Sequence, residues 1–177
     1  MAACAVAVST GRVPGDSFLW RFNDADPAGA LDDLLACCSS RRWAGEMVVG
    51  RPYGDVNQLI ARSDRVFAAL QWEDLREALD AHPRIGERAV GDSREAGWSR
   101  GEQAAAGGGG DELKQANVDY EDRFGHVFLI CATGLTADAI LAEAHRRLRN
   151  DVAAEREEVR EELCKIAALR LVKLAEA

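Results

Sequence analysis

The sequence contains few aromatic residues and no long apolar run. Aromatic side chains make up 6% of the 177 residues, whereas Ala and Leu are abundant and Val and Ile are spread thinly. This composition suits packed helices better than a β-sandwich or barrel. The length is sufficient for one domain with a hydrophobic core and is short for two. We therefore expect an all-α fold, a compact single-domain bundle of about eight helices.

Basic charge is also scarce. The formal net charge is −8, and the Lys and Arg residues form no basic stripe. Nucleic-acid binding depends on concentrated Lys and Arg that displace counterions from phosphates, so the charge argues against it. The apolar opening MAACAVAV is too short for a signal-peptide core or a membrane span. We expect residues 1–18 to form a flexible extension, residues 19–177 to form the domain, and no membrane binding.

Motifs for metals and common cofactors are missing as well. The five cysteines include no C-x-x-C pair, the three histidines are scattered, and H-E-x-x-H is absent. No phosphate loop, G-x-S-x-G or G-x-G-x-x-G motif occurs either. The sequence therefore predicts no metal site and gives no support for hydride or phosphoryl transfer. The odd number of cysteines fits a reducing, cytoplasmic compartment.

Capping signals and hydrophobic spacing divide the chain into helices. The sequence predicts helices in segments 27–38, 40–49, 55–70, 72–82, 98–106, 111–124, 136–150 and 151–173. Gly125 stands in the position that ends the sixth of these helices. The apolar run HVFLICATG at 126–134 fits either a strand or a buried helix and is left unassigned.

The last predicted helix places an arginine on its apolar face. Val159, Leu163, Ile166 and Leu174 share one side of this helix, and Arg170 lies in the middle of them. An unpaired buried guanidinium is costly, so we expect a carboxylate, a phosphate or a helix C-terminus beside it. A structural ion pair satisfies this requirement as well as a bound ligand does.

WSRGEQ at 98–103 carries the spacing of a capping box. Ser99 as N-cap and Glu102 three residues later satisfy each other's backbone N–H groups at a helix start. If this helix start faces a cleft, its backbone donors and Gln103 can hold an anionic or amide-rich ligand. The two interpretations do not exclude each other.

AHPRIGE at 81–87 joins a histidine to a proline where a helix is expected to end. Pro83 disfavours the α conformation at His82, so we expect the imidazole to project away from the preceding helix on a stiff elbow. Imidazole accepts and donates protons near neutral pH, which suits catalysis. A histidine at a helix C-terminus can also simply favour the helix dipole. His126 and His145 are assigned no role.

These segments occur together in an order that resembles one enzyme family. AHPRIGE, WSRGEQ, NVDYEDRFGHVFLICATG at 117–134 and Arg170 in RLVKL resemble in order and spacing the 2-oxo-4-hydroxy-4-carboxy-5-ureidoimidazoline (OHCU) decarboxylases. The resemblance covers roughly residues 19–174, and the ordered set is far more specific than any single piece. It implies a compact all-helical fold, usually a homodimer, with a small-molecule substrate and neither metal nor organic cofactor.

By the same resemblance, the reaction is the decarboxylation of OHCU to (S)-allantoin and CO2, the last step of urate oxidation in purine catabolism. The implied catalytic residues are His82, Glu102 and Arg170. The implied substrate contacts are Pro83, Ser99, Arg100, Gly101, Glu102, Gln103, Phe128, Leu129, Ile130, Cys131 and Ala132. Two alternatives stay open: a related decarboxylase acting on another ureido or imidazolinone acid, and a non-catalytic helical module in which His82 and Arg170 are structural.

Overall fold

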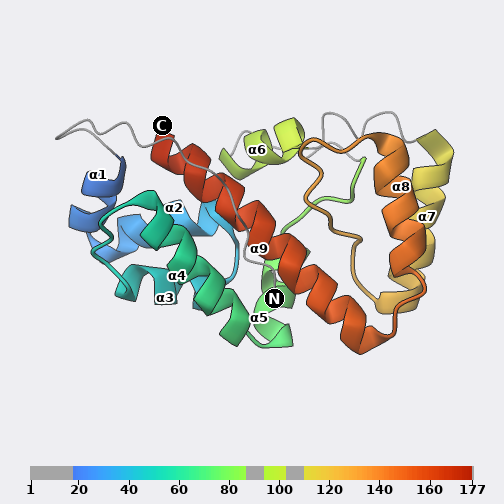
Figure 1. The fold of residues 1–177 in the computed structure, drawn as a ribbon, viewed down its shortest axis with the longest axis horizontal. Helices are drawn as coiled ribbons and strands as arrows, with labels where there is room; N and C mark the ends of the chain where they lie inside the picture. The colour runs from blue at the N-terminus through green and yellow to red at the C-terminus, as the bar shows by residue number, and fades with distance from the viewer. Residues whose placement is uncertain (1–17, 87–93, 103–109, 177) are drawn as a thin grey trace. The chain divides into compact units, whose positions relative to one another are not determined.

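The fold is built from helices. The computed structural model describes residues 18–86, 94–102 and 110–176, and all regular secondary structure in these ranges is α-helical (Figure 1). This confirms the predicted all-α class. The helices are α1 (Phe18–Asp24), α2 (Pro27–Cys37), α3 (Arg41–Val49), α4 (Val56–Ala69), α5 (Trp72–Asp80), α6 (Arg94–Glu102), α7 (Gly110–Phe124), α8 (Ala137–Arg147) and α9 (Val152–Glu176).

The chain divides into two units, and two helices contribute to both. The first unit comprises the described part of residues 1–75 together with the described part of residues 164–177. The second unit comprises the described part of residues 76–163. Both unit boundaries fall inside helices, the first in α5 and the second in α9, a continuous helix of 25 residues (Figure 1). The chain therefore enters the second unit along α5 and leaves it along α9.

Helices of the first unit begin at side-chain caps, as the sequence predicts. Asp26 accepts two backbone hydrogen bonds at the start of α2, and Pro27 is the first residue of that helix. Helix α3 packs against α2 and α4. Between α3 and α4, Trp43 Nε1 donates a hydrogen bond of 3.0 Å to Ser63 Oγ, and both side chains are fully buried. The core of this unit thus contains a polar pair whose hydrogen bond is satisfied.

The turn between α3 and α4 holds helix α1, which the sequence patterns did not predict. Arg51 Nη1 donates hydrogen bonds to the carbonyl oxygens of Phe22 and Ala25, at 2.7 and 2.8 Å. Asn23 and Tyr53 exchange two hydrogen bonds, from Asn23 Nδ2 to the Tyr53 carbonyl and from the Tyr53 N–H to Asn23 Oδ1. These tertiary bonds stabilise a seven-residue helix that is too short to persist on its own propensity.

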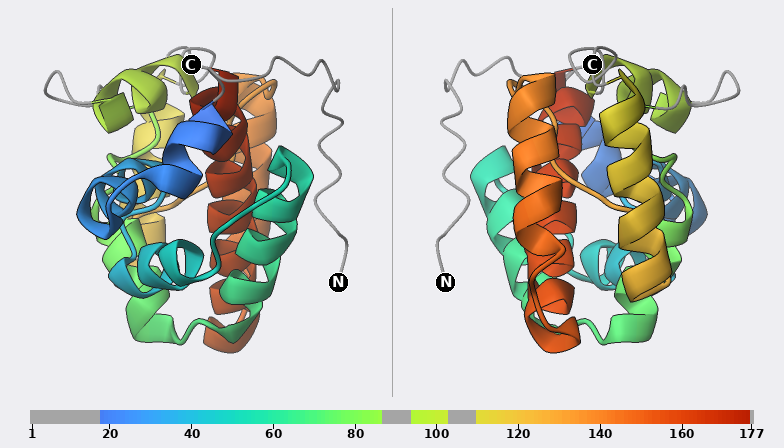
Figure 2. Two further views of the ribbon diagram at one scale, coloured as in Figure 1. Left: turned by 90° about the vertical axis from the view of Figure 1, so that its left-hand side faces the viewer. Right: turned by 90° about the vertical axis from the view of Figure 1, so that its right-hand side faces the viewer.

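The core of the second unit lies between α7, α8 and the stretch that connects them. Helices α7 and α8 pack side by side (Figure 2). The buried core residues are Ile85, Leu113, Ala116, Tyr120, Phe128, Ile130, Ala132, Ile140 and Ala144. Ile85 comes from the loop after α5, so this core joins the AHPRIGE loop to the apolar run at 126–134.

The ends of the second unit's helices follow the predicted capping pattern. Gly125 has φ +74° directly after α7, a conformation that favours glycine. The Thr136 side chain accepts a hydrogen bond from the Ala139 N–H at the start of α8. The Asp151 side chain accepts one from the Ala154 N–H, at 2.8 Å, at the start of α9. The predicted boundaries of α7 and the starts of α8 and α9 are therefore confirmed to within about one residue, whereas α8 ends at Arg147, three residues before the predicted end.

Of the helices in the described ranges, none is long and apolar enough to cross a membrane.

Residues 1–17, nearly all of the predicted N-terminal extension, lie outside the described residues, and so do residues 87–93 and 103–109. The extension therefore stays a prediction, as does the division of the chain at residue 18.

Candidate active site

His82 is buried and packs back onto the helix that precedes it. Helix α5 ends at Asp80, two residues earlier, and the His82 N–H donates a hydrogen bond of 3.0 Å to the Leu79 carbonyl. The ring Nδ1 lies 2.9 Å from the Ala78 carbonyl oxygen, and the side chain is 9% exposed. The predicted helix end is confirmed, whereas the prediction that the ring projects away from α5 is wrong. The Ala78 carbonyl also accepts a hydrogen bond of 3.3 Å from the Ala81 N–H, so Nδ1 is its second donor at the end of α5.

This hydrogen bond determines which nitrogen of the neutral ring can accept a proton. A carbonyl oxygen only accepts hydrogen bonds, so Nδ1 of His82 carries the proton in its contact with Ala78. In neutral imidazole, Nε2 then holds the lone pair. The structure therefore provides a histidine whose orientation and tautomer are set by the end of α5.

Helix α6 begins earlier than the sequence predicts. It starts at Arg94, so Ser99 is its sixth residue and Glu102 its last. The predicted capping box, with Ser99 as N-cap, is therefore wrong, and Ser99–Glu102 is not a helix start with free backbone donors. Arg94, Glu95 and Ala96 are good helix formers and extend the helix upstream.

For two of the predicted site residues in the last turn of α6, the structure describes the exposure of the side chain or backbone. Glu102 is half-buried and Gly101 is exposed. Gln103, predicted to contact substrate, lies outside the described residues, and Ser99 and Arg100 are placed as residues of α6 only. The substrate contacts predicted for this stretch stay predictions.

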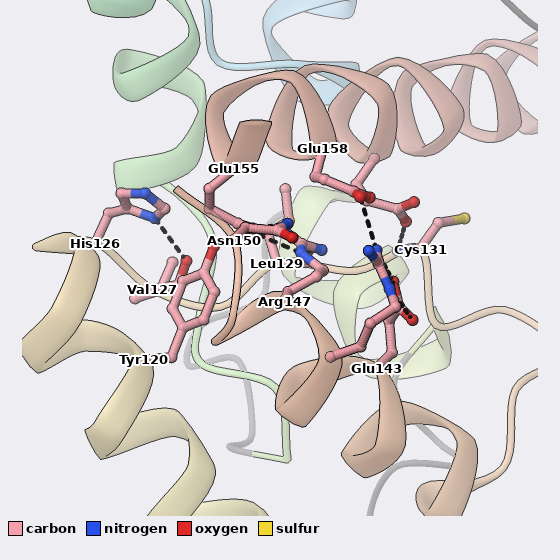
Figure 3. Close-up of polar contacts among 12 residues, drawn as sticks. Tyr120, His126, Val127, Leu129, Cys131, Glu143, Arg147, Asn150, Glu155 and Glu158 are labelled. Carbon is pink, nitrogen blue, oxygen red and sulfur yellow. Dashed lines mark hydrogen bonds and ion pairs between the residues drawn. The ribbon is translucent and has the colours of Figure 1, made fainter. Parts of the chain in front are cut away.

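The apolar run after α7 is neither strand nor helix. Phe128, Leu129, Ile130 and Ala132 are buried, and Cys131 is half-buried. Arg147 Nη1 donates a hydrogen bond of 2.8 Å to the Leu129 carbonyl (Figure 3). The Cys131 N–H donates one of 2.7 Å to Glu162 Oε2.

Side chains from α8 and α9 thus satisfy backbone groups that a neighbouring strand or helical turn would otherwise bind. This explains why the pattern of apolar residues did not identify the element. It also means that the Cys131 N–H already has a protein acceptor, so this group is not free for the substrate contacts that the resemblance implies for the segment.

Arg147 is the centre of a buried polar cluster in the second unit. Its Nε and Nη2 lie 2.9 and 2.6 Å from Glu155 Oε1, and both side chains are at most 1% exposed. The Tyr120 hydroxyl donates a hydrogen bond to the same carboxylate, and Asn150 Nδ2 donates one of 2.8 Å to Glu155 Oε2. The guanidinium Cζ lies 4.9 Å from the centroid of the Phe128 ring. The ion pair therefore has the additional hydrogen bonds that a buried pair requires.

Burial changes the protonation of this cluster. Burial raises the pKa of the Tyr120 hydroxyl far above its ordinary value, so Tyr120 acts as a donor at all relevant pH values. Burial opposes the charged form of Arg147, but hydrogen bonds to Glu155 and the nearby negative groups leave its pKa above the ordinary value. His126 packs edge-on against Tyr120, and burial lowers the pKa of its imidazole. Close to neutral pH, Tyr120 therefore stays neutral and Arg147 stays charged.

Arg170 lies on α9 in the first unit and is fully buried, as its position in the apolar stripe predicts. Its Nη1 lies 3.4 Å from the carbonyl oxygen of Cys37, the last residue of α2. A helix C-terminus was one of the three expected partners, and this expectation is confirmed. The negative end of the α2 dipole favours the guanidinium.

Arg147 and Glu162 were missed by the sequence analysis. Arg147 follows Ile140 and Ala144 at spacings of seven and three residues, so it lies on the buried face of α8. The periodicity that identified Arg170 was therefore also present for Arg147. Glu162 carried the same signal, because it lies three residues after Val159 and four before Ile166 on the buried face of α9. Periodicity could not identify its partner, the Cys131 N–H, which is 31 residues away.

The predicted site residues fall in both units. His82, Pro83, residues 99–102 and residues 128–132 belong to the second unit, whereas Arg170 belongs to the first. In the second unit, Ile85 of the His82 loop shares one core with Phe128 and Ile130. Within the part of the chain that the structure describes, no group of three or more His, Cys, Asp or Glu side chains is placed to hold a metal ion.

Known proteins with similar sequences act in urate degradation. The family model described as OHCU decarboxylase matches residues 23–172. The chain is 32% identical over 150 residues to the uric acid degradation bifunctional protein TTL of Arabidopsis thaliana, a match that covers 81% of this chain and 46% of that protein. It is 32% identical over 128 residues to the OHCU decarboxylase of Amia calva, covering 69% of this chain and 73% of that protein. The chain thus spans about half of the bifunctional relative.

A solved structure has a similar fold. The crystal structure of an OHCU decarboxylase in the presence of (S)-allantoin matches with a TM-score of 0.71 and 29% sequence identity. The match covers 82% of this chain and 99% of that one. The family model extends over residues of both units, from α1 to α9. By sequence and by fold, this chain belongs to the OHCU decarboxylase family.

Proposed function

We propose that this protein decarboxylates OHCU to (S)-allantoin and CO2, the last step of urate oxidation. The observation that carries the proposal is the family match over residues 23–172, which includes His82, Glu102 and Arg170. The geometry of His82 supports it, because a buried histidine with a defined tautomer suits directed proton transfer.

The substrate itself can accept the electrons that decarboxylation releases. OHCU carries its carboxylate and a hydroxyl on one ring carbon, next to the ring carbon that bears the ureido group. As the bond to CO2 breaks, its electron pair forms a double bond between these two carbons, and the adjacent C=N bond of the ring takes up a proton at nitrogen. Protonation of the ureido-bearing carbon and loss of the hydroxyl proton then give allantoin. The protein therefore has to orient the substrate, stabilise charge and direct protons.

Each predicted site residue has a role in this scheme. Nε2 of His82 exchanges protons with the substrate and protonates the new stereocentre from one face. Arg170 binds the carboxylate or ring oxygens, and Glu102 orients the hydroxyl or the His82 ring. The substrate contacts come from Pro83, Ser99–Gln103 and Phe128–Ala132. Among these residues, Gln103 forms hydrogen bonds with the urea-like edge of the substrate. In segment Phe128–Ala132, the contacts come from groups other than the Cys131 N–H, because this N–H already donates a hydrogen bond to Glu162.

General acid–base catalysis supplies only part of the rate in this scheme. It contributes roughly 10²–10⁴-fold, so positioning and charge stabilisation supply the rest.

We further propose that the enzyme works without a metal or organic cofactor, as a cytoplasmic homodimer. The family resemblance supports both proposals, and light scattering on the purified protein tests the homodimer.

The decisive experiment supplies the enzyme with freshly made substrate. Urate oxidase and hydroxyisourate hydrolase generate OHCU from urate in the cuvette, and circular dichroism follows the formation of optically active allantoin. Rapid formation of (S)-allantoin supports the proposal. Because OHCU decays unaided to racemic allantoin, slow racemic product at the rate of the protein-free control would reject it in favour of another substrate or a non-catalytic role.

A further inference from the structure

Helix α7 holds the loop that carries His82. Arg84 Nε and Nη2 donate hydrogen bonds of 2.6 and 2.7 Å to the two carboxylate oxygens of Glu121. Such a bidentate pair fixes the relative orientation of its two partners. Its side chains are 45% and 22% exposed, so the pair adds little to stability. Its main consequence is therefore geometric.

Asn117 makes a second bond to the same loop. Its Nδ2 donates a hydrogen bond of 2.9 Å to the Ile85 carbonyl oxygen, and the side chain is 5% exposed. Asn117 and Glu121 are four residues apart and share one face of α7. Leu113, four residues before Asn117, belongs to the same buried core as the Ile85 side chain. One face of α7 thus contacts the loop through an apolar, an amide and a carboxylate side chain.

The loop leaves His82 little freedom between these contacts and α5. Upstream, the His82 N–H and Nδ1 are bound to carbonyls of the last turn of α5. Downstream, Arg84 and Ile85 are bound to α7. The one residue between them is Pro83, whose ring restricts φ. The position of the imidazole is therefore set from two helices.

We propose that Asn117 and Glu121 are positioning residues for His82. This proposal rests on the decarboxylase function proposed above. Neither residue has to touch substrate, because each acts on the loop through its backbone or through Arg84. Small displacements of a catalytic group cost far more in rate than in stability, since reaction requires near-contact geometry. Loosening the loop is therefore expected to lower kcat while the fold and substrate binding remain.

The experiment compares two neighbouring acidic residues of α7. Glu121→Ala breaks the pair with Arg84, and Asp122→Ala removes the same charge from an exposed neighbour. We expect Glu121→Ala to lower kcat by roughly 10–100-fold with KM within about twofold of wild type. Glu121→Gln, which keeps one acceptor for Arg84, should restore part of the loss. Asp122→Ala should match wild type, and all three variants should unfold close to the wild-type urea midpoint.

A second measurement reads His82 directly. The chain has three histidines, so a His82→Ala spectrum assigns the His82 imidazole signals in a long-range ¹H–¹⁵N NMR experiment. Wild type should show the tautomer protonated at Nδ1, and Glu121→Ala and Asn117→Ala should shift these signals toward a mixture. If Glu121→Ala leaves both kcat and the His82 signals as in Asp122→Ala, the proposal is overturned. A loss of kcat that only tracks a loss of stability, with unchanged His82 signals, overturns it as well.

The two proposals fail in different ways. Wild-type protein that leaves OHCU at its spontaneous rate of decay would reject the decarboxylase function. In that case the NMR comparison of Glu121→Ala with Asp122→Ala would still support or overturn the positioning of His82, because it requires no turnover.

Discussion

His82 is held by a hydrogen bond that asparagine can reproduce. Asn at this position places Nδ2 near the site of the imidazole Nδ1 and can still donate to the Ala78 carbonyl, but it has no titrating nitrogen. We predict that His82→Ala and His82→Asn both lower turnover by roughly 10²–10⁴-fold, the usual contribution of acid–base catalysis. Initial rates with enzymatically generated OHCU provide the measurement.

The same two variants should differ in stability. His82→Ala loses the hydrogen bond to Ala78, which costs about 1 kcal/mol in the free energy of unfolding, whereas His82→Asn retains it. Urea unfolding measures the difference. Wild-type turnover in either variant would contradict the catalytic role and favour a histidine that only completes the end of α5.

His126 is buried among aromatic rings. Burial lowers its pKa in the folded protein, so the unfolded chain binds the proton more readily. The unfolded state therefore gains stability as pH falls below about 6.5, the ordinary histidine value. We predict that the free energy of unfolding decreases from pH 7 toward pH 5, and that His126→Phe removes part of this decrease.

Urea unfolding of wild type and His126→Phe at a series of pH values provides the test. Phenylalanine has no titrating group and packs with Tyr120 and Phe124, which already contact His126. His145→Phe, the same substitution at an exposed position, is the matched control. Identical pH profiles for wild type and His126→Phe would show that His126 does not contribute.

Single residues differ in how well the sequence predicts their surroundings. Arg170 was predicted to be buried beside a carboxylate, a phosphate or a helix C-terminus, because its neighbours in one helix define an apolar face. The structure places it at the C-terminus of α2. The contacts of Asn117 with Ile85 and of Glu121 with Arg84 join residues 32 and 37 positions apart. Periodicity and capping are local signals, so they identify the face on which a residue lies but not its partner across the fold.

At the level of elements, local chemistry predicts where most helices begin and end. Pro27, Thr136 and Gly125 mark boundaries that the structure confirms, because each satisfies or relieves a backbone requirement of the helix itself. The start of α6 was predicted wrongly because an S-x-x-E pattern also occurs inside helices. Residues 126–132 could not be assigned from their pattern, and in the structure the Leu129 carbonyl and the Cys131 N–H are bound by Arg147 and Glu162 from other helices.

The segment after α7 depends on the side chain of Arg147. Arg147 binds the Leu129 carbonyl, stacks near Phe128 and neutralises Glu155. We predict that Arg147→Met lowers the free energy of unfolding by about 3–5 kcal/mol, because it leaves a buried carboxylate without its partner. Thermal or urea unfolding measures this loss.

Removing both charges separates the ion pair from the packing around it. Arg147→Met with Glu155→Leu replaces the pair by apolar groups and should recover much of the stability lost in Arg147→Met. Arg146→Met is the matched control, because the neighbouring Arg146 pairs with Glu143 and Glu158 on a partly exposed surface and should cost about 1 kcal/mol or less. A double variant as unstable as Arg147→Met would show that the contact with Leu129 dominates instead.

For the whole molecule, the order of motifs carried more information than any single motif. AHPRIGE, WSRGEQ and NVDYEDRFGHVFLICATG fall in the second unit and Arg170 in the first, and the family match extends over both. An isolated histidine–proline pair is explained by a helix end as well as by a catalytic site. The structure shows that this pair does end a helix. The sequence could therefore predict the fold class and family, whereas the tautomer of His82 and the bonds to its loop required coordinates.

The proposed chemistry also makes a prediction for the whole enzyme. The electron pair released with CO2 is taken up within the substrate ring, so the reaction needs no pyridoxal-type electron acceptor. We predict that dialysis against EDTA, followed by removal of the chelator, leaves kcat/KM for OHCU unchanged within about twofold, and that the purified protein absorbs no light above 300 nm beyond its aromatic tail. Dialysis without EDTA is the control. A loss of activity that Zn²⁺ or Mg²⁺ restores would require a metal-assisted mechanism, and an added chromophore that dissociates with activity would require an organic cofactor.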